Sequence, residues 1–133
     1  MASLIYSNFK TELGKKTMDM INDVIKVALV TSSYTASAAH STFSDITNEV
    51  SGTGYSAGGA TLGSKTFGTV AAGTFDGADV TWTTSTLTAA AAVIYNTSVS
   101  NKLIAYIDFG GNYTTVGGTL QITWNASGII TLT

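Results

Sequence analysis

His40, the only histidine, stands beside Ser41 and close to Asp45, and these residue types can form a hydrolase triad. Serine catalysis needs a base that is hydrogen-bonded to the hydroxyl and a carboxylate that orients the base. Neighbours within one loop rarely adopt that geometry, and the residues around Ser41 do not form a Gly-x-Ser-x-Gly elbow. The sequence therefore favours a solvated loop histidine, and we expect no catalytic residues.

The sequence also contains few residues that could bind a metal ion. One histidine and no cysteine remove the usual zinc ligands and any cysteine nucleophile. Asp76 and Asp79 could contribute to a calcium site, but the segment lacks the further acidic positions and the closing glutamate of an EF-hand loop. A polar turn that enters a strand is the favoured interpretation, and we expect no metal or other cofactor.

Two further groups of residues could bind ligands. The glycines at positions 52, 54, 58 and 59 lack the Lys-Ser/Thr ending of a phosphate loop and do not match Gly-x-Gly-x-x-Gly. We interpret residues 51–59 as a flexible loop that orders on contact with a neighbour. Several strand aromatics could form a sugar-stacking platform, but such side chains more often pack in a core. They are Trp82, Tyr95, Tyr106, Tyr113 and Trp124.

The composition limits the possible partners. Charged residues make up 11% of the chain and hydrophobic residues 44%. Low charge is typical of surfaces that become buried in interfaces, and also of threonine-rich β domains that solvate through hydroxyls. Arginine is absent, the net charge is -2 and the pI is about 5.0. These values argue against nucleic acid and anionic membranes as partners.

The sequence shows no membrane or signal segment and predicts several elements of secondary structure. No apolar run approaches the length of a membrane span, and the first residues lack the basic and apolar regions of a signal peptide. A helix is predicted over residues 6–13, with Ser7 as a cap, followed by a loop at residues 15–19. Residues 24–31 form the first predicted strand, residues 32–42 a loop and residues 43–50 a short helical turn.

Period-two alternation predicts strands through the rest of the chain. Gly128 is expected to close a hairpin between residues 122–124 and 129–132. The further strands are predicted at residues 60–67, 74–84, 86–95, 102–109, 118–125 and 128–133.

Seven or so short strands indicate a mainly β fold, an antiparallel β-sandwich or jelly-roll-like domain with a short N-terminal helix. Residues 1–133 form one predicted domain, with residues 1–22 as an N-terminal arm and helix and residues 23–133 as the β core. The core is expected to contain Val27, Leu29, Trp82, Ile94, Ile107, Phe109, Ile122, Trp124 and Ile130.

Several long blocks of the chain resemble a family of small structural proteins of tailed bacteriophages and prophages. The blocks begin with residues 25–35, Ile-Lys-Val-Ala-Leu-Val-Thr-Ser-Ser-Tyr-Thr, and residues 45–55, Asp-Ile-Thr-Asn-Glu-Val-Ser-Gly-Thr-Gly-Tyr. Later blocks are residues 103–110, Leu-Ile-Ala-Tyr-Ile-Asp-Phe-Gly, and residues 122–129, Ile-Thr-Trp-Asn-Ala-Ser-Gly-Ile. Ala36 stands where relatives often have proline, which leaves that loop less sharply specified.

The resemblance implies a virion protein assembled in the host bacterial cytoplasm, either a head decoration (cement) protein or a neck or tail accessory protein. It implies no enzymatic residues. The expected partners are major capsid or neck and tail proteins and further copies of the chain, as a homo-oligomer. We expect contacts from residues 1–9, 32–42 and 51–59. The predicted contact residues are Ile5, Tyr6, Phe9, Tyr34, His40, Phe43 and Tyr55.

Two other classes of function remain open at this level. A receptor- or carbohydrate-binding module of a phage tail fibre would expose clustered aromatic side chains on one face. An enzyme would need a reactive constellation, which the residue inventory disfavours.

Overall fold

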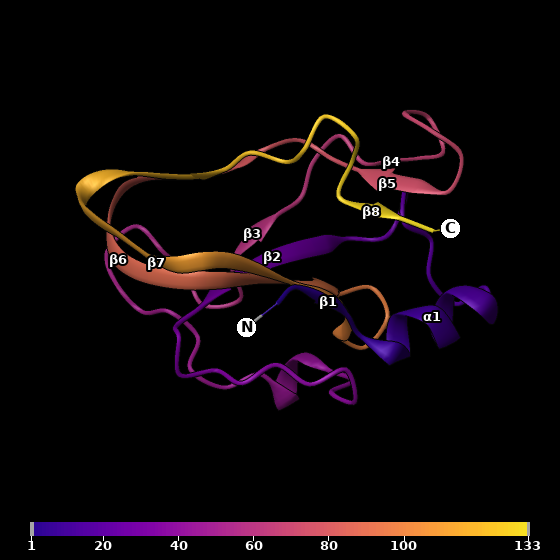
Figure 1. Ribbon diagram of the computed structural model, residues 1–133, viewed down its shortest axis with the longest axis horizontal. Helices are drawn as coiled ribbons and strands as arrows, with labels where there is room; N and C mark the ends of the chain where they lie inside the picture. The colour runs from indigo at the N-terminus through magenta and orange to yellow at the C-terminus, as the bar shows by residue number, and fades with distance from the viewer. Residues whose placement is uncertain (1, 133) are drawn as a thin grey trace.

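The computed structural model describes residues 2–132 and shows a mainly β protein with antiparallel sheets and one short helix near the N-terminus. A five-stranded sheet has the order β1-β7-β6-β2-β3, and a three-stranded sheet has the order β4-β5-β8. The arrangement is that of a β-sandwich, as the alternation predicts (Figure 1).

The strands of the larger sheet differ greatly in length. β2 spans Ile25–Val30, β6 spans Val80–Asn96 and β7 spans Lys102–Ile122. Two very short strands complete this sheet, β1 at Leu4–Ile5 and β3 at Ala60–Thr61. The smaller sheet contains β4 at Thr66–Phe67, β5 at Thr74–Asp76 and β8 at Ile130–Thr131.

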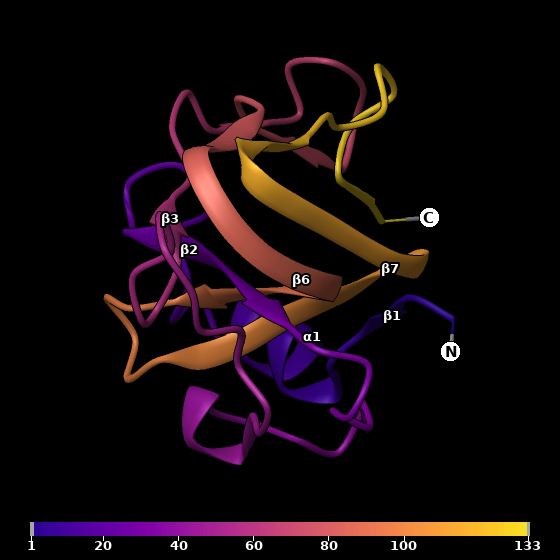
Figure 2. The same ribbon diagram turned by 90° about the vertical axis from the view of Figure 1, so that its left-hand side faces the viewer.

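The long β6–β7 hairpin builds both layers of the sandwich. Near the hairpin turn it pairs with β1 and β2, and then both strands curl over together so that their other halves lie above the first layer (Figures 1 and 2). The sharpest irregularity lies where Ala89 pairs with Tyr113 but Ala91 pairs with Asp108, which leaves residues 109–112 as a bulge in β7. Gly110, with φ +81°, supplies the positive φ that this bulge uses.

Two smaller bulges increase the curl. Between Trp82 and Ser85 the extra residue lies on β6, and between Ser85 and Leu87 the extra residue lies on β7. The buried Ser85 hydroxyl lies 3.0 Å from the Gly118 carbonyl, to which it donates, and 2.9 Å from the Thr115 hydroxyl. This side chain therefore satisfies polar groups that the bulges remove from the ladder.

The main core lies between the two layers. Val27, Leu29 and Ile94 point into it from the first layer, and Trp82 and Ile122 point into it from the second. Ile130 is also buried there, whereas Ile107, Phe109 and Trp124 are only partly buried at its margin. The predicted core is thus confirmed for six of its nine members, and the other three lie at one open side.

A second core covers the opposite face of the first layer. Val30, Val93 and Leu103 on the sheet pack with Tyr6 and Tyr34. The segment of residues 31–46, which contains the 3₁₀ helix η1 at Phe43–Asp45, lies below this face in Figure 1. The loop that was expected to contact partners is therefore a covering layer of the protein's own sheet.

The N-terminal elements belong to the body of the fold rather than to a projecting arm. α1 spans Ser7–Gly14, close to the predicted helix, although Tyr6 rather than Ser7 occupies the cap position. Glu12 is buried and accepts a hydrogen bond of 2.7 Å from Lys102 at the start of β7. This bond, with a second from Thr17, lowers the pKa of Glu12 to about 2.

Several predicted strand boundaries were wrong. The stretches predicted at 86–95 and 102–109 are parts of the long β6 and β7, and β7 also absorbs much of the stretch at 118–125. The predicted strand 60–67 divides into β3 and β4, which belong to different sheets. The turn at Gly128 exists, but β8 pairs with β5 and not with residues 122–124. Thr133 lies outside the described residues.

The glycine segment 51–59 is packed tightly, and our interpretation of it as a flexible loop was wrong. A Cβ on Gly59, whose φ is +83°, would lie 2.0 Å from the Val27 carbonyl oxygen, and one on Gly52 would lie 2.3 Å from the Thr86 carbonyl oxygen. Glu49 fixes the segment through a 2.7 Å hydrogen bond from the Gly58 amide and a further bond from the Tyr55 hydroxyl. These glycines allow the segment to lie directly against β2 and β6.

Replacing Gly59 by alanine is expected to destabilise the protein by at least about 2 kcal/mol, because the added Cβ meets backbone at a left-handed position. Gly63→Ala is the matched control, since nothing lies within 4 Å of its added Cβ. That variant should stay within about 0.5 kcal/mol of wild type. Chemical denaturation measures both, and equal stability of the two variants would contradict the packing described.

Candidate functional site

The structure does not assemble the histidine-serine-aspartate group into a triad. The Nδ1 atom of His40 lies 2.9 Å from the hydroxyl of Tyr34, not of Ser41. Asp45 accepts hydrogen bonds from the backbone amides of Ser41 and Thr42, at 2.9 and 3.3 Å, and so caps η1. These backbone bonds lower the pKa of Asp45. The geometry is that of a loop anchor.

One serine motif was missed in the sequence. Gly54-Tyr55-Ser56-Ala57-Gly58 has the Gly-x-Ser-x-Gly spacing of a nucleophile elbow. That elbow requires a strand before the serine and a helix after it, and neither flanks Ser56. Among residues 2–132, no hydrogen bond joins the Ser56 hydroxyl to an imidazole or a carboxylate. The match in spacing carries no catalytic geometry.

The two candidate calcium ligands have structural partners. Asp76 accepts a hydrogen bond of 2.9 Å from the Gly77 amide, and Asp79 accepts one of 3.0 Å from the Trp124 amide. Within residues 2–132, no group of three or more metal-ligating side chains comes together. No helix in this part of the chain is long and apolar enough to cross a membrane.

Three of the predicted contact residues are core residues. Tyr6, Phe9 and Tyr34 are buried, so their side chains are not available to a partner, and this part of the prediction was wrong. Tyr6 and Tyr34 share a buried hydrogen bond of 2.9 Å, and Tyr34 also bonds to His40. Burial raises the pKa of both tyrosines. Their role is to fasten the segment 31–46 onto the sheet.

The other four predicted contacts remain partly accessible. Ile5, His40, Phe43 and Tyr55 are half-buried. Phe43 stacks on Tyr95 with ring centroids 4.2 Å apart, and the Tyr55 hydroxyl accepts a 3.0 Å hydrogen bond from the Leu29 amide. Each therefore has an internal role that limits the area it can offer.

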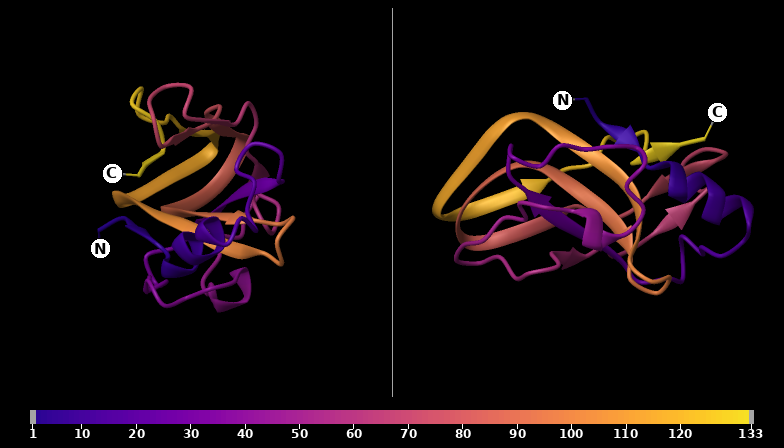
Figure 3. Two further views of the ribbon diagram at one scale, coloured as in Figure 1. Left: turned by 90° about the vertical axis from the view of Figure 1, so that its right-hand side faces the viewer. Right: turned by 90° about the horizontal axis from the view of Figure 1, so that it is seen from below.

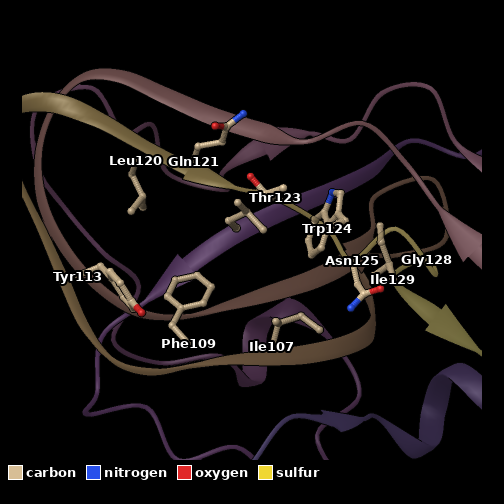
Figure 4. Close-up of a pocket in the computed structure, with 11 residues that line it drawn as sticks. Ile107, Phe109, Tyr113, Leu120, Gln121, Thr123, Trp124, Asn125, Gly128 and Ile129 are labelled. Carbon is tan, nitrogen blue, oxygen red and sulfur yellow. The ribbon is translucent and has the colours of Figure 1, made fainter.

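A more accessible surface lies where β7 bends back on itself. An apolar groove of about 440 Å³ runs between the two halves of β7 and the turn that follows it (Figure 4). We call it the β7 groove. It is lined by Ile107, Phe109, Tyr113, Leu120, Gln121, Ile122, Thr123, Trp124, Asn125, Gly128 and Ile129.

Three of the residues that line the β7 groove are aromatic. Phe109 and Tyr113 meet edge to face with centroids 6.0 Å apart, and 53% of Tyr113 is exposed. The indole N–H of Trp124 donates a hydrogen bond of 2.8 Å to the Ala78 carbonyl, which fixes the ring at the margin of the core. With that donor occupied, the indole can offer only its apolar surface to a partner.

Comparison of the chain with protein-family models, with curated proteins and with solved structures found no match. The function is therefore inferred from the geometry and from the sequence resemblance described above.

Removing the Tyr34 hydroxyl should loosen the covering segment. Tyr34→Phe leaves the buried Tyr6 hydroxyl without its partner and should cost about 1–3 kcal/mol of stability. Tyr113→Phe is the control, because this tyrosine is exposed at the groove, and it should have little effect. Thermal unfolding measures both, and an unchanged Tyr34→Phe variant would show that the hydrogen-bond chain does not hold the segment.

Proposed function

We propose that this protein is a non-enzymatic structural subunit of a tailed-bacteriophage particle. It would serve as a head decoration protein or a neck or tail accessory protein, bound to other coat or tail subunits and to copies of itself. The resemblance in the sequence supports the placement in a virion. The observation that carries the assembly role is an accessible apolar surface on a stretch of chain without charge.

That stretch runs from Phe109 to Leu132 and contains no Lys, Arg, Asp or Glu. Among the described residues, it contains three of the six exposed large hydrophobic side chains: Val116 at 83%, Tyr113 at 53% and Leu132 at 39%. Tyr113 also lines the apolar β7 groove, and an apolar groove of this kind marks an interaction site in many soluble proteins. Its burial would desolvate no ionic side chain of this segment, which lowers the cost of forming an interface.

A particle that contains many copies of the subunit makes such a surface effective. Each contact of an uncharged edge contributes a modest free energy, but a shell repeats the contact many times, and the sum holds the subunit firmly. The same neutrality keeps the contacts insensitive to salt. The half-buried residues Ile5, His40, Phe43 and Tyr55 stay within the proposal as secondary contacts.

Incorporation into particles tests the proposal. Quantitative mass spectrometry of purified particles from cells that express the protein should find it in many copies, in fixed ratio to the major capsid protein. Val116→Glu should lower that ratio severalfold, because it puts a charge at the most exposed of the large apolar side chains. Val70→Glu, at a valine that is 47% exposed in the loop before β5, should incorporate like wild type. Absence of the wild-type protein from particles would refute the proposal.

A carbohydrate-binding module is the second candidate, favoured by the three aromatic side chains that line the β7 groove with the amide of Asn125 beside them. Sugars stack on aromatic faces and bond to such amides. In this case the isolated protein should bind a glycan on an array, and Tyr113→Ala should abolish the binding while Val70→Ala should not. No binding to any glycan would remove this candidate.

A further inference from the structure

The outer edge of β7 is the one long edge that the fold leaves uncovered within residues 2–132. β1, β3, β4 and β8 also lie at sheet edges, but each has two residues. β1 pairs with β7 only at Ala105 and Tyr106, and no strand pairs with the outer side of β7 beyond them. Figure 3 shows this side of the curled hairpin open.

The other edge of the hairpin, along β6, is covered. The glycine segment 51–59 lies along the outer edge of β6, where the Thr86 amide donates a 3.0 Å hydrogen bond to the Thr53 carbonyl. The chain thus covers one edge of the curled hairpin with its own backbone and leaves the other open. Proteins usually protect an open edge with charge or proline, and the part of the β7 edge beyond Asp108 has neither.

The regular part of the open edge is Gly118–Ile122, beyond the bulge at Gly117. Leu120 and Ile122 pair with Trp82 and Val80 and face the core, whereas Thr119 and Gln121 face outward. The edge therefore presents backbone hydrogen-bonding groups between an apolar inner row and a neutral outer row. A strand that pairs here must supply the same pattern of faces.

We propose that the occupant of this edge is the same edge of a second copy, paired antiparallel about a two-fold axis at Leu120. A neutral edge is complementary to itself, because a two-fold axis places no like charges opposite each other. The proposal rests on the assembly role put forward above and names the partner for its main surface. The second copy also closes the mouth of the β7 groove, which lies directly behind this edge.

The register follows from the side chains. With Leu120 opposite Leu120 of the second copy, Ile122 faces Gly118 of the second copy, where the absence of a side chain leaves room. The same register sets Thr119 opposite Gln121 on the outer row. A shift of one residue would place inner side chains opposite outer ones.

Pairs of charged substitutions at Thr119 and Gln121 test both the proposed pairing edge and its register. In Thr119→Lys/Gln121→Lys, each introduced lysine faces an introduced lysine of the second copy, so dimerisation should weaken by roughly tenfold or more. In Thr119→Lys/Gln121→Glu, each introduced lysine faces an introduced glutamate, so the dimer should persist. An equimolar mixture of Thr119→Lys/Gln121→Lys with Thr119→Glu/Gln121→Glu should restore it. Both positions are exposed, so folding is preserved.

Analytical ultracentrifugation at concentrations up to about 100 µM gives the dimer population. Thr69→Lys/Ala72→Lys changes the net charge equally at two exposed loop positions and should dimerise like wild type. A wild-type monomer, or equal association of both lysine-containing edge variants, would overturn the proposal. A monomer that binds a soluble glycan in the groove would assign the surface to a sugar instead.

Particle incorporation separates this inference from the proposed function. A wild-type monomer that still enters particles would refute the dimer and leave the structural role intact. A wild-type dimer that obeys the charge-pair pattern but never enters particles would refute the structural role and leave the dimer intact.

Discussion

The pairing of β6 with β7 is the interaction on which the rest of the structure depends. These strands stay paired from Asn96 and Lys102 at the turn to Val80 and Ile122 at the far end, and they supply part of both layers. Because one hairpin folds over on itself, the first and second layers are linked through backbone hydrogen bonds as well as through the core. The helix, the covering segment 31–46 and the short strands all pack onto this frame.

The curl of the hairpin also creates the candidate site. Bulges concentrate the bend at residues 109–112 and near Gly117, so β7 closes around the core from one side only. Ile107, Phe109 and Trp124 are left at the margin as a consequence. The groove is the unsealed side of the core, and a neighbouring subunit would complete the sandwich there. The same bend in β7 therefore shapes both the core and the proposed assembly surface.

Parts of this arrangement are visible in the sequence. The branched run at residues 25–30 and the helix that ends at Gly14 follow local rules, and the structure places both within a residue or two of expectation. The alternation also identifies the mainly β class. β7 was divided wrongly because Gly110, Gly111 and Gly117, which are typical of turns, lie here within or beside bulges.

The proposed contact surface was harder to predict. Tyr6, Phe9 and Tyr34 resemble contact residues in a loop-rich N-terminal region, but long-range packing against β2, β6 and β7 buries them. Conversely, Val116 and Tyr113 lie in a pattern typical of an ordinary strand, and only the direction of the curl leaves them exposed. The absence of charge after Asp108 is the one sequence signal that coincides with the surface proposed here.

Hydrogen exchange at the β7 edge tests most directly whether this side of the molecule is completed by a neighbour. The amides of Gly118–Ile122 should exchange rapidly wherever they point outward in the dilute protein and become protected in assembled material, while those of β2 remain protected throughout. Equal exchange of the β7 amides in the dilute and assembled states would contradict the account.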